Sequence, residues 1–332
     1  MNQQDNNLAN PLYQSVPGNG TTFGRLPLIT TLSNAQVDIA VLGIPFDSLV
    51  TYRPGARFGP NAIRQSSVLC RSYSQQMEVE VYSLSRVGDA GDVSVNPFDY
   101  LETFRQIEAK IAALQNIDAS VVSLGGDHSI LLPILRAMSK KYSNLTLIQF
   151  DAHTDTSDGV SLGSRHHHGT SIRRAIEEGV IQGDRIFQIG IRGTFGSASY
   201  NDFAKQAGIK ILDMKGAHNS YERELFIQKI REVAGDDPCY LTFDIDGIDP
   251  AFAPGTGTPV VGGLTSFEAL DIMHCLKGLQ FIGGDVVEVA PAYDHSEITS
   301  LLGAAIAFEL MALIAIARQL RPVQIPALAP TL

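Results

Sequence analysis

Short apolar runs alternate with longer helix-like segments along most of the chain. The apolar runs are rich in Val, Ile and Phe and almost uninterrupted, which is typical of strands buried on both faces of a parallel sheet. They cover residues 37–44, 119–126, 145–153, 185–191, 210–213, 239–246 and 279–289. The helical segments cover residues 61–69, 99–114, 130–139, 170–178, 221–234 and 266–276. This alternation predicts a three-layer α/β/α fold around a central, mostly parallel sheet.

Three segments add detail to this pattern. Residues 1–35 are rich in Asn, Gln, Pro and Gly without periodicity, so we expect an N-terminal arm followed by one domain over residues 36–332. Residues 301–317 are apolar apart from Glu309, and we expect a buried helix because the run is short for a membrane span and carries a central charge. In the segment 266–276 we expect Ser266 to be the helix N-cap.

Composition narrows the classes of partner. The net charge is −10, from 25 basic and 35 acidic residues, and the absence of a basic cluster argues against nucleic-acid binding. Cys70, Cys239 and Cys275 are too far apart for a disulfide framework or a thiolate metal site. The first basic residue is Arg25, and no signal or presequence pattern precedes it. We therefore expect a cytoplasmic protein without nucleic-acid or membrane partners.

The segment Asp-Ala-His-Thr-Asp at 151–155 follows directly on a predicted strand. Alternate residues of an extended chain share a face, so Asp151, His153 and Asp155 would converge at the strand end. Bringing these groups together is costly without a positive charge, and no basic side chain lies between Lys141 and Arg165. A bound cation is the expected compensation.

Two other predicted strand ends carry the same residue types. Asp244 and Asp246 share a face at the end of the run 239–246, with Asp249 just beyond. His128 lies in a Gly-Gly-Asp-His-Ser turn after the run 119–126, where we expect Asp127 to have a structural role. Ligands of such folds bind at the carboxyl ends of the strands, so we expect these side chains to meet there.

Together the strand ends offer two histidines and four aspartates as metal ligands. They are His128, His153, Asp151, Asp155, Asp244 and Asp246. A carboxylate-rich set with some imidazole and no thiolate favours Mn, Mg or a similar divalent cation over structural zinc. Six ligands are too many for one ion that must also admit substrate, so we expect two. Paired cations make hydroxide available at neutral pH, which predicts hydrolysis at a trigonal carbon or at phosphorus.

The segments GGDHS, DAHTD and FDIDGIDP, with HGT at 168–170 and PGTGTP at 254–259, resemble the ureohydrolase family of arginases and agmatinases. The resemblance runs from about residue 37 to residue 317, and it implies a single ureohydrolase catalytic domain with an eight-stranded parallel sheet. It also implies a dinuclear manganese centre that hydrolyses a guanidino group to urea and an amine. A homotrimer or homohexamer is the implied assembly.

The resemblance further implies a role for each ligand. One ion would be held by His128, Asp151, Asp155 and Asp244, and the other by Asp151, His153, Asp244 and Asp246. Asp151 and Asp244 would therefore bridge the two ions.

Catalytic and substrate-binding roles follow from the same resemblance. His168 matches the family's proton-shuttling histidine, and an imidazole suits protonation of a leaving amine. Glu288 matches the carboxylate that holds the guanidinium, a planar cation that prefers a bidentate carboxylate. The expected catalytic residues are His168, Glu288 and Asp155. The expected substrate-binding residues are Arg165, His166, His167, His168 and Glu288, while Asp285 receives no role.

The loop at 156–164 bears on the substrate. It does not match the Ser- and Asn-containing loop with which arginases read the amino-acid head of arginine, so arginine is disfavoured. The segments HGT and RPGARFGP resemble the agmatinase branch, and agmatine is the expected substrate. Arg165, His166 and His167 would instead suit the carboxylate of 4-guanidinobutyrate, 3-guanidinopropionate or a proclavaminate-type compound. Hydrolysis of free guanidine with nickel is a further alternative.

Two readings from other classes stay open. The same kind of α/β scaffold hosts single-metal deacetylases, and a non-catalytic metal-binding protein is also compatible with the fold. The second pair of carboxylates and His128 favour two ions over one, and every expected ligand position is present.

Overall fold

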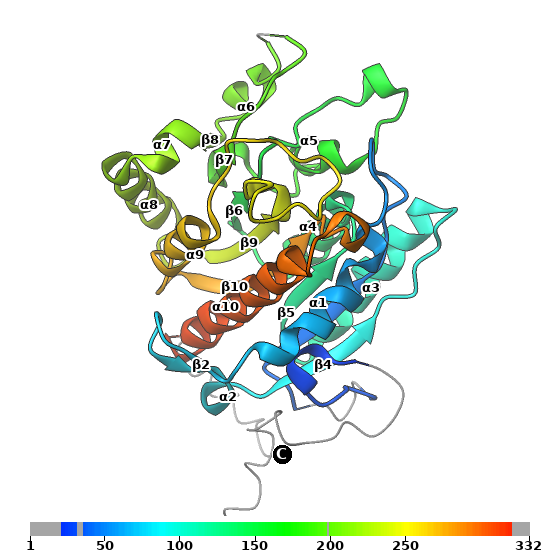
Figure 1. The fold of residues 1–332 in the computed structure, drawn as a ribbon, viewed down its shortest axis with the longest axis vertical. Coiled ribbons are helices and arrows are strands. Elements are labelled where there is room, and N and C mark those ends of the chain that lie inside the picture. Colours follow the sequence, from blue (N-terminus) through cyan, green and yellow to red (C-terminus); the bar gives the residue numbers. More distant parts are fainter. Residues whose placement is uncertain (1–20, 32–35, 198, 321–332) are drawn as a thin grey trace, which may run out of the picture.

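Eight parallel strands form the centre of the molecule in a computed structural model, which describes residues 21–31, 36–197 and 199–320 (Figure 1). The strands are β1 (Ile39–Ile44), β4 (Val87–Asp92), β5 (Ser120–Gly125), β6 (Thr146–Phe150), β7 (Ile186–Ile191), β8 (Lys210–Asp213), β9 (Pro238–Asp244) and β10 (Gln280–Val287). They pair in the order β4-β1-β5-β10-β9-β6-β7-β8. The predicted parallel α/β sheet is therefore confirmed.

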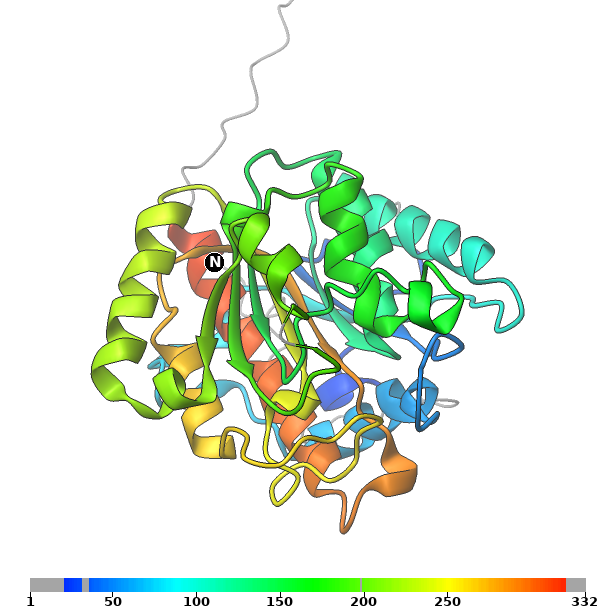
Figure 2. The same cartoon turned by 90° about the horizontal axis from the view of Figure 1, so that it is seen from above.

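Helices cover both faces of this sheet (Figure 2). One layer holds α3 (Tyr100–Asn116), α4 (Leu131–Ser139), α5 (Ser171–Glu177) and α6 (Asp202–Gln206). The other holds α1 (Gly59–Ser66), α8 (Ser220–Ala234), α9 (Ser266–His274) and α10 (Ile298–Leu320). Successive side chains of β1 point to opposite faces of the sheet, so Ile39 and Val41 pack into one core cluster while Ala40 and Leu42 pack into the other. The three-layer prediction is confirmed.

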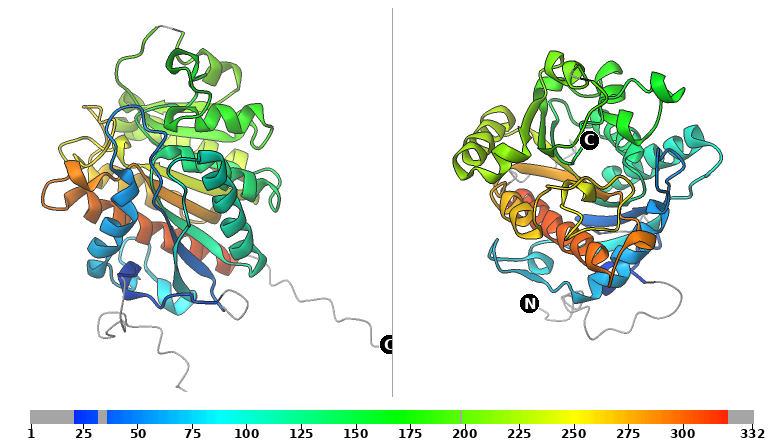
Figure 3. Two further views of the ribbon diagram at one scale, coloured as in Figure 1. Left: turned by 90° about the vertical axis from the view of Figure 1, so that its right-hand side faces the viewer. Right: turned by 45° about the horizontal axis from the view of Figure 1, so that its top comes forward.

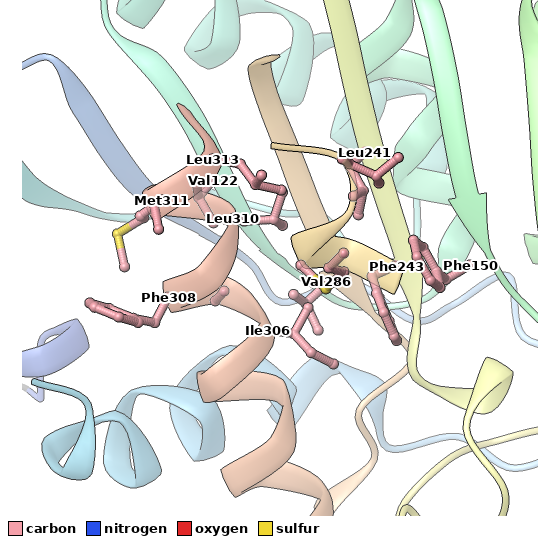
Figure 4. Packing of buried hydrophobic residues seen from close by; sticks show 14 of the residues in the cluster. Val122, Phe150, Leu241, Phe243, Val286, Ile306, Phe308, Leu310, Met311 and Leu313 are labelled. Atoms are coloured by element: carbon pink, nitrogen blue, oxygen red, sulfur yellow. The ribbon is translucent and has the colours of Figure 1, made fainter. Parts of the chain in front are cut away.

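The long helix α10 lies across the sheet beside α1 (Figure 3). It is long and apolar enough to cross a membrane, yet 78% of its most apolar window is buried inside the protein. Ile306 and Leu310 pack towards Leu241 and Val286 of the sheet (Figure 4). Its one acidic residue, Glu309, accepts a hydrogen bond from Ser74 Oγ at 2.8 Å. The expected buried helix is confirmed, and it extends three residues beyond the apolar run at each end.

The edge strand β4 was not expected, because its sequence Val-Gly-Asp-Ala-Gly-Asp lacks an apolar run. Its Asp89 is fully buried, and both carboxylate oxygens accept from the Arg64 guanidinium at 2.9 Å. The buried ion pair thus places an Asp where the pattern rule requires an apolar residue. Smaller elements are α2 (Val81–Leu84), α7 (Met214–His218) and a hairpin of β2 (Tyr73–Ser74) and β3 (Val79–Glu80).

The helix cap at α9 differs from the expectation by one residue. Thr265, not Ser266, is the N-cap, and its side chain accepts from the Glu268 backbone N–H while the Glu268 carboxylate accepts from Thr265 N. This is a capping box, which satisfies two helix-end donors at once.

The end of the expected N-terminal arm packs onto the domain. Phe23 and Leu26 are buried in one core cluster, and Ile29 N donates to Asp89 O at 2.7 Å. The other residues of the expected arm, 1–20 and 32–35, lie outside the described residues. An arm over residues 1–20 remains a prediction.

Candidate metal centre and active site

The carboxyl ends of four neighbouring strands build the site. His128 begins the turn after β5, Asp151 follows β6, Asp244 ends β9 and Glu288 follows β10. Because β5, β10, β9 and β6 lie side by side, segments distant in sequence deliver their side chains to one place. This is the usual ligand position of an open parallel sheet.

The first cluster forms around His128. Its Nδ1 lies 3.1 Å from Asp151 Oδ2, 2.9 Å from Asp155 Oδ2 and 3.3 Å from Asp244 Oδ2. All four side chains are at most 6% exposed. Three carboxylates and one imidazole therefore surround one point in the protein interior. Asp151 and Asp155 meet as predicted, but not through an extended chain, because β6 ends at Phe150 and Asp155 has a φ of +52°.

The second cluster shares Asp151 with the first. His153 Nδ1 lies 3.5 Å from Asp151 Oδ1 and 3.1 Å from Asp246 Oδ2. Candidate ligand atoms of Asp151, His153 and Asp246 lie within 4.8 Å of one another, as do those of His128, Asp151 and Asp244. Asp151 thus offers Oδ2 to one cluster and Oδ1 to the other, which is the arrangement of a carboxylate that bridges two cations.

Hydrogen bonds determine which ring nitrogen of neutral His128 carries the proton and which carries the lone pair. Thr242 Oγ1 donates its only proton to Asp285 Oδ1 at 2.6 Å, so it must accept from His128 Nε2, 2.8 Å away. Tyr240 OH donates to the second oxygen of Asp285 at 2.8 Å. The lone pair of neutral His128 therefore lies on Nδ1, the atom that faces the carboxylates. Asp285, which had no expected role, orients a candidate ligand through Thr242.

The electrostatics of the clusters favour an added positive charge. Burial opposes protonation of His128, but Asp155 and the neighbouring carboxylates outweigh it and raise its pKa well above the usual value. Burial, with Asp246 and Asp151, raises the pKa of Asp244. His128 Nδ1 is also buried without a hydrogen bond of acceptable geometry. The Nδ1 lone pair and the three carboxylates around it repel one another, and a bound divalent cation would remove this repulsion. The donor set therefore fits a metal.

Glu288 and His168 face each other beside the clusters. Glu288 Oε1 accepts from His128 N at 2.9 Å and lies 2.8 Å from His168 Nδ1, whereas Glu288 Oε2 is buried without a partner among the described residues. Thr51 Oγ1 lies 2.7 Å from His168 Nε2 and can accept its proton. Burial opposes protonation of His168, but Glu288 raises its pKa to about 9. Glu288 has a φ of +62°, a strained conformation for a residue other than glycine.

A cavity of about 210 Å³ opens onto the two clusters. It is lined by Thr51, His153, Asp155, Ser157, Leu162, His167, His168, Gly169, Tyr200, Asp244 and Thr258. The predicted residues His153, Asp155, His167, His168 and Asp244 thus meet at one opening.

Three predicted substrate-binding residues are not among those that line this cavity. One of them, Glu288, contacts His168 of the cavity wall through its Oε1. Arg165 is 66% exposed in its side chain and pairs with Glu177 at 2.8 Å. The His166 ring packs against Tyr100 and Phe104, with ring centroids 5.5 Å and 6.3 Å away. Adjacent positions in the run 165–168 therefore face different surroundings.

Comparison with known proteins identifies the family. The family model described as "Arginase family" matches residues 37–313. The chain belongs to the arginase family. A guanidinopropionase of Pseudomonas aeruginosa is 41% identical to this arginase-family chain over 92% of its length and 93% of the relative. An agmatinase of Neisseria gonorrhoeae is 41% identical over 93% of this chain and 97% of the relative.

Solved structures agree with this assignment. The proclavaminate amidinohydrolase of Streptomyces clavuligerus superimposes with a TM-score of 0.83 at 38% identity, over 92% of this chain and 99% of that one. The arginase-family chain is accordingly a hydrolase that acts on C–N bonds of linear amidines.

Several residues of this arginase-family site were not found from the sequence. Thr258 donates to Asp246 Oδ2 at 3.1 Å. It lies in the PGTGTP segment, so the resemblance of that segment to the family was a signal that could have identified it. Thr51 contacts His168 from a loop after β1, and Thr242 contacts His128 from within β9. Tyr200 lines the cavity from a segment without any motif. Only the three-dimensional fold brings these last three residues to the site.

Proposed function

We propose that this chain hydrolyses a small linear guanidino compound to urea and an amine, with two Mn²⁺ ions per subunit. The observation that carries the proposal is the sharing of Asp151, whose two oxygens serve the His128 cluster and the His153 cluster separately. Asp244, beside His128, is the second proposed bridge. A single-metal deacetylase would not need two such clusters.

His128, His153 and the four aspartates Asp151, Asp155, Asp244 and Asp246 would hold the ions. When bound, the two cations would supply hydroxide at neutral pH and Lewis-acid stabilisation of developing negative charge. The set is rich in carboxylates and contains no thiolate, which suits Mn²⁺, although Ni²⁺ accepts the same ligand types.

The residues beside the clusters would bind the substrate and move protons. Glu288 Oε2, which is buried and has no partner in the described part of the chain, would accept hydrogen bonds from the guanidinium. That interaction would direct the central guanidino carbon towards the metal clusters. His168, which pairs with Glu288 beside the clusters, would give a proton to the leaving amine nitrogen.

Two kinds of tail stand as candidates for the rest of the substrate. Agmatine, the substrate expected from the sequence, ends in an ammonium, whereas guanidinopropionate and guanidinobutyrate end in a carboxylate. The agmatinase and the guanidinopropionase are equally similar to this chain, so identity does not separate the two. A cytoplasmic homotrimer or homohexamer is the proposed state of the enzyme.

A urea-release assay on the manganese-loaded protein tests the proposal. The panel is agmatine, 4-guanidinobutyrate, 3-guanidinopropionate, arginine and guanidine, repeated after loading with nickel. Urea from at least one of these compounds supports the proposal. Two bound ions without urea from any of them would contradict it and direct the search towards amide hydrolysis.

A further inference from the structure

His167 carries a hydrogen-bond donor that the proposed reaction does not use. Gly169 N donates to His167 Nδ1 at 3.1 Å, so Nδ1 is unprotonated and the ring proton lies on Nε2. Nε2 is buried and has no partner in the described part of the chain. A buried N–H group without a partner costs free energy, which a ligand that accepts its proton would recover.

The position of His167 is fixed before any ligand binds. Its backbone N donates to Thr170 Oγ1 at 3.0 Å, and Thr170 Oγ1 donates back to His167 O at 2.8 Å. The residue is 8% exposed and lines the cavity beside His168. Burial, His168 and Arg174 lower its pKa to about 4, so the ring is neutral at pH 7 and keeps one donor. Its side chain is therefore a preorganised part of the cavity wall.

We propose that His167 Nε2–H recognises the far end of the substrate, and that the chain acts on a guanidino acid, whose carboxylate tail accepts this hydrogen bond. The inference rests on the proposed function and selects between its two candidate tails. An ammonium tail, as in agmatine, has only donors and would meet the His167 donor without forming a hydrogen bond.

The charges around the cavity support a carboxylate tail. Among the described lining residues the only carboxylates are Asp155 and Asp244, and both belong to the His128 cluster. An ammonium tail would thus find no uncommitted carboxylate in the cavity wall. Arg174, which pairs with Glu177 at 3.1 Å, and Asp158 act on His167 with opposite signs. The lack of an uncommitted carboxylate among the described lining residues is therefore the charge argument for a carboxylate tail. Leu162 supplies an apolar contact for the methylene groups between the two ends.

Three groups of alkylguanidines separate the effects of the tail. 4-Guanidinobutyrate and 3-guanidinopropionate carry a carboxylate, agmatine carries an ammonium, and butylguanidine carries no polar tail group. We expect the wild-type kcat/KM for the better guanidino acid to exceed that for butylguanidine and for agmatine by at least about tenfold, mainly through KM. A charged hydrogen bond of ordinary strength corresponds to about 10- to 100-fold.

Two substitutions at His167 separate its two nitrogens. In His167→Asn the amide oxygen occupies the place of Nδ1 and still accepts from Gly169 N, but the Nε2 donor is lost. In His167→Gln the amide nitrogen replaces Nε2 and restores a donor. We expect His167→Asn to lower the ratio of kcat/KM for the guanidino acid over butylguanidine by about 10- to 100-fold, and His167→Gln to restore part of it. His166→Asn is the matched control, since that ring packs on Tyr100 and Phe104, and should leave the ratio unchanged.

Each outcome bears on a different statement. Preference of the wild type for agmatine, or an unchanged ratio in His167→Asn with circular dichroism like that of the wild type, would overturn the His167 inference alone. The wild-type preference tests it even when a variant does not fold. No urea from any compound, butylguanidine included, would overturn the proposed function and with it the inference.

Discussion

The floor and the rim of the site are built in opposite ways. The floor consists of His128, Asp151 and Asp244 at strand ends. All three are buried, and a carboxylate oxygen of each aspartate lies within 3.3 Å of His128 Nδ1. The rim includes the loop between β6 and α5, in which His166 packs on aromatic rings while His167 lines the cavity. Strand geometry therefore fixes the floor, whereas the tertiary surroundings of each loop residue fix the rim. Substitutions at the floor should therefore change metal binding. Substitutions at the rim should change the substrate preference, or have little effect on activity where the side chain faces away from the cavity.

Loss of a proposed bridging carboxylate should have the largest effect. We expect Asp244→Asn to lower kcat/KM for urea release by at least about a thousandfold, because it removes a negative charge from a centre that holds two cations. The measurement is the steady-state rate together with the metal content of each variant. Asp249→Asn is the control, because Asp249 accepts from Gly262 N and Gly263 N in the next loop and should not alter the number of ions. Two ions and near-normal turnover in Asp244→Asn would contradict the floor assignment.

The hydrogen-bond chain behind His128 should have the next largest effect. Thr242→Val removes the acceptor of His128 Nε2–H and leaves Asp285 with one donor fewer. We expect the affinity for Mn²⁺ to fall by about 10- to 100-fold, as when a residue that orients a metal ligand is removed. Competition with a chelator measures it. Thr146→Val tests the same change at a buried site at the start of β6, where Thr146 Oγ1 accepts from Arg185. An equal loss of affinity in both variants would assign the effect to general destabilisation.

The pair formed by His168 and Glu288 predicts a pH dependence of stability in the metal-free protein. The pKa of His168 is raised to about 9 in the folded state, from about 6.5 in the unfolded chain. The folded state therefore binds the proton more tightly, and this contribution to stability is complete below about pH 6.5 and lost as the pH rises through about 9. Urea denaturation across this range measures the loss. His168→Gln should remove this component, and an unchanged slope in that variant would contradict the assignment.

The smallest effect is expected at Arg165. Its side chain is 66% exposed and pairs with Glu177, and such surface pairs contribute about 0–1 kcal/mol to stability. We expect Arg165→Ala to change the free energy of unfolding by no more than this and to change kcat/KM for the better substrate by less than about threefold. A tenfold or larger rise in KM for the guanidino acids alone would show that Arg165 reaches the substrate tail and that the rim extends beyond the cavity wall.

Periodicity explains why so much of the floor was predictable. Asp151, His153 and Asp155 follow an apolar strand at alternate positions, and the rule for parallel sheets places them at the ligand-binding edge. Asp89 shows the converse, because its ion pair with Arg64 allows a strand without an apolar run. Thr51 and Tyr200 reach the site from loops without a motif, so only the folded chain reveals them. Arg165 and His166 were expected in the pocket because of their neighbours in sequence, but side chains of adjacent loop residues need not share surroundings.

Electron paramagnetic resonance of the fully manganese-loaded protein tests the central claim most directly. Two Mn²⁺ ions bridged by shared carboxylates, at the separation of about 3.5–4 Å typical of two-metal sites, should couple magnetically. The account predicts the spectrum of a coupled pair at two ions per chain, and its loss in Asp151→Asn. A spectrum of isolated ions at full loading, or saturation at one ion per chain, would contradict the shared role of Asp151.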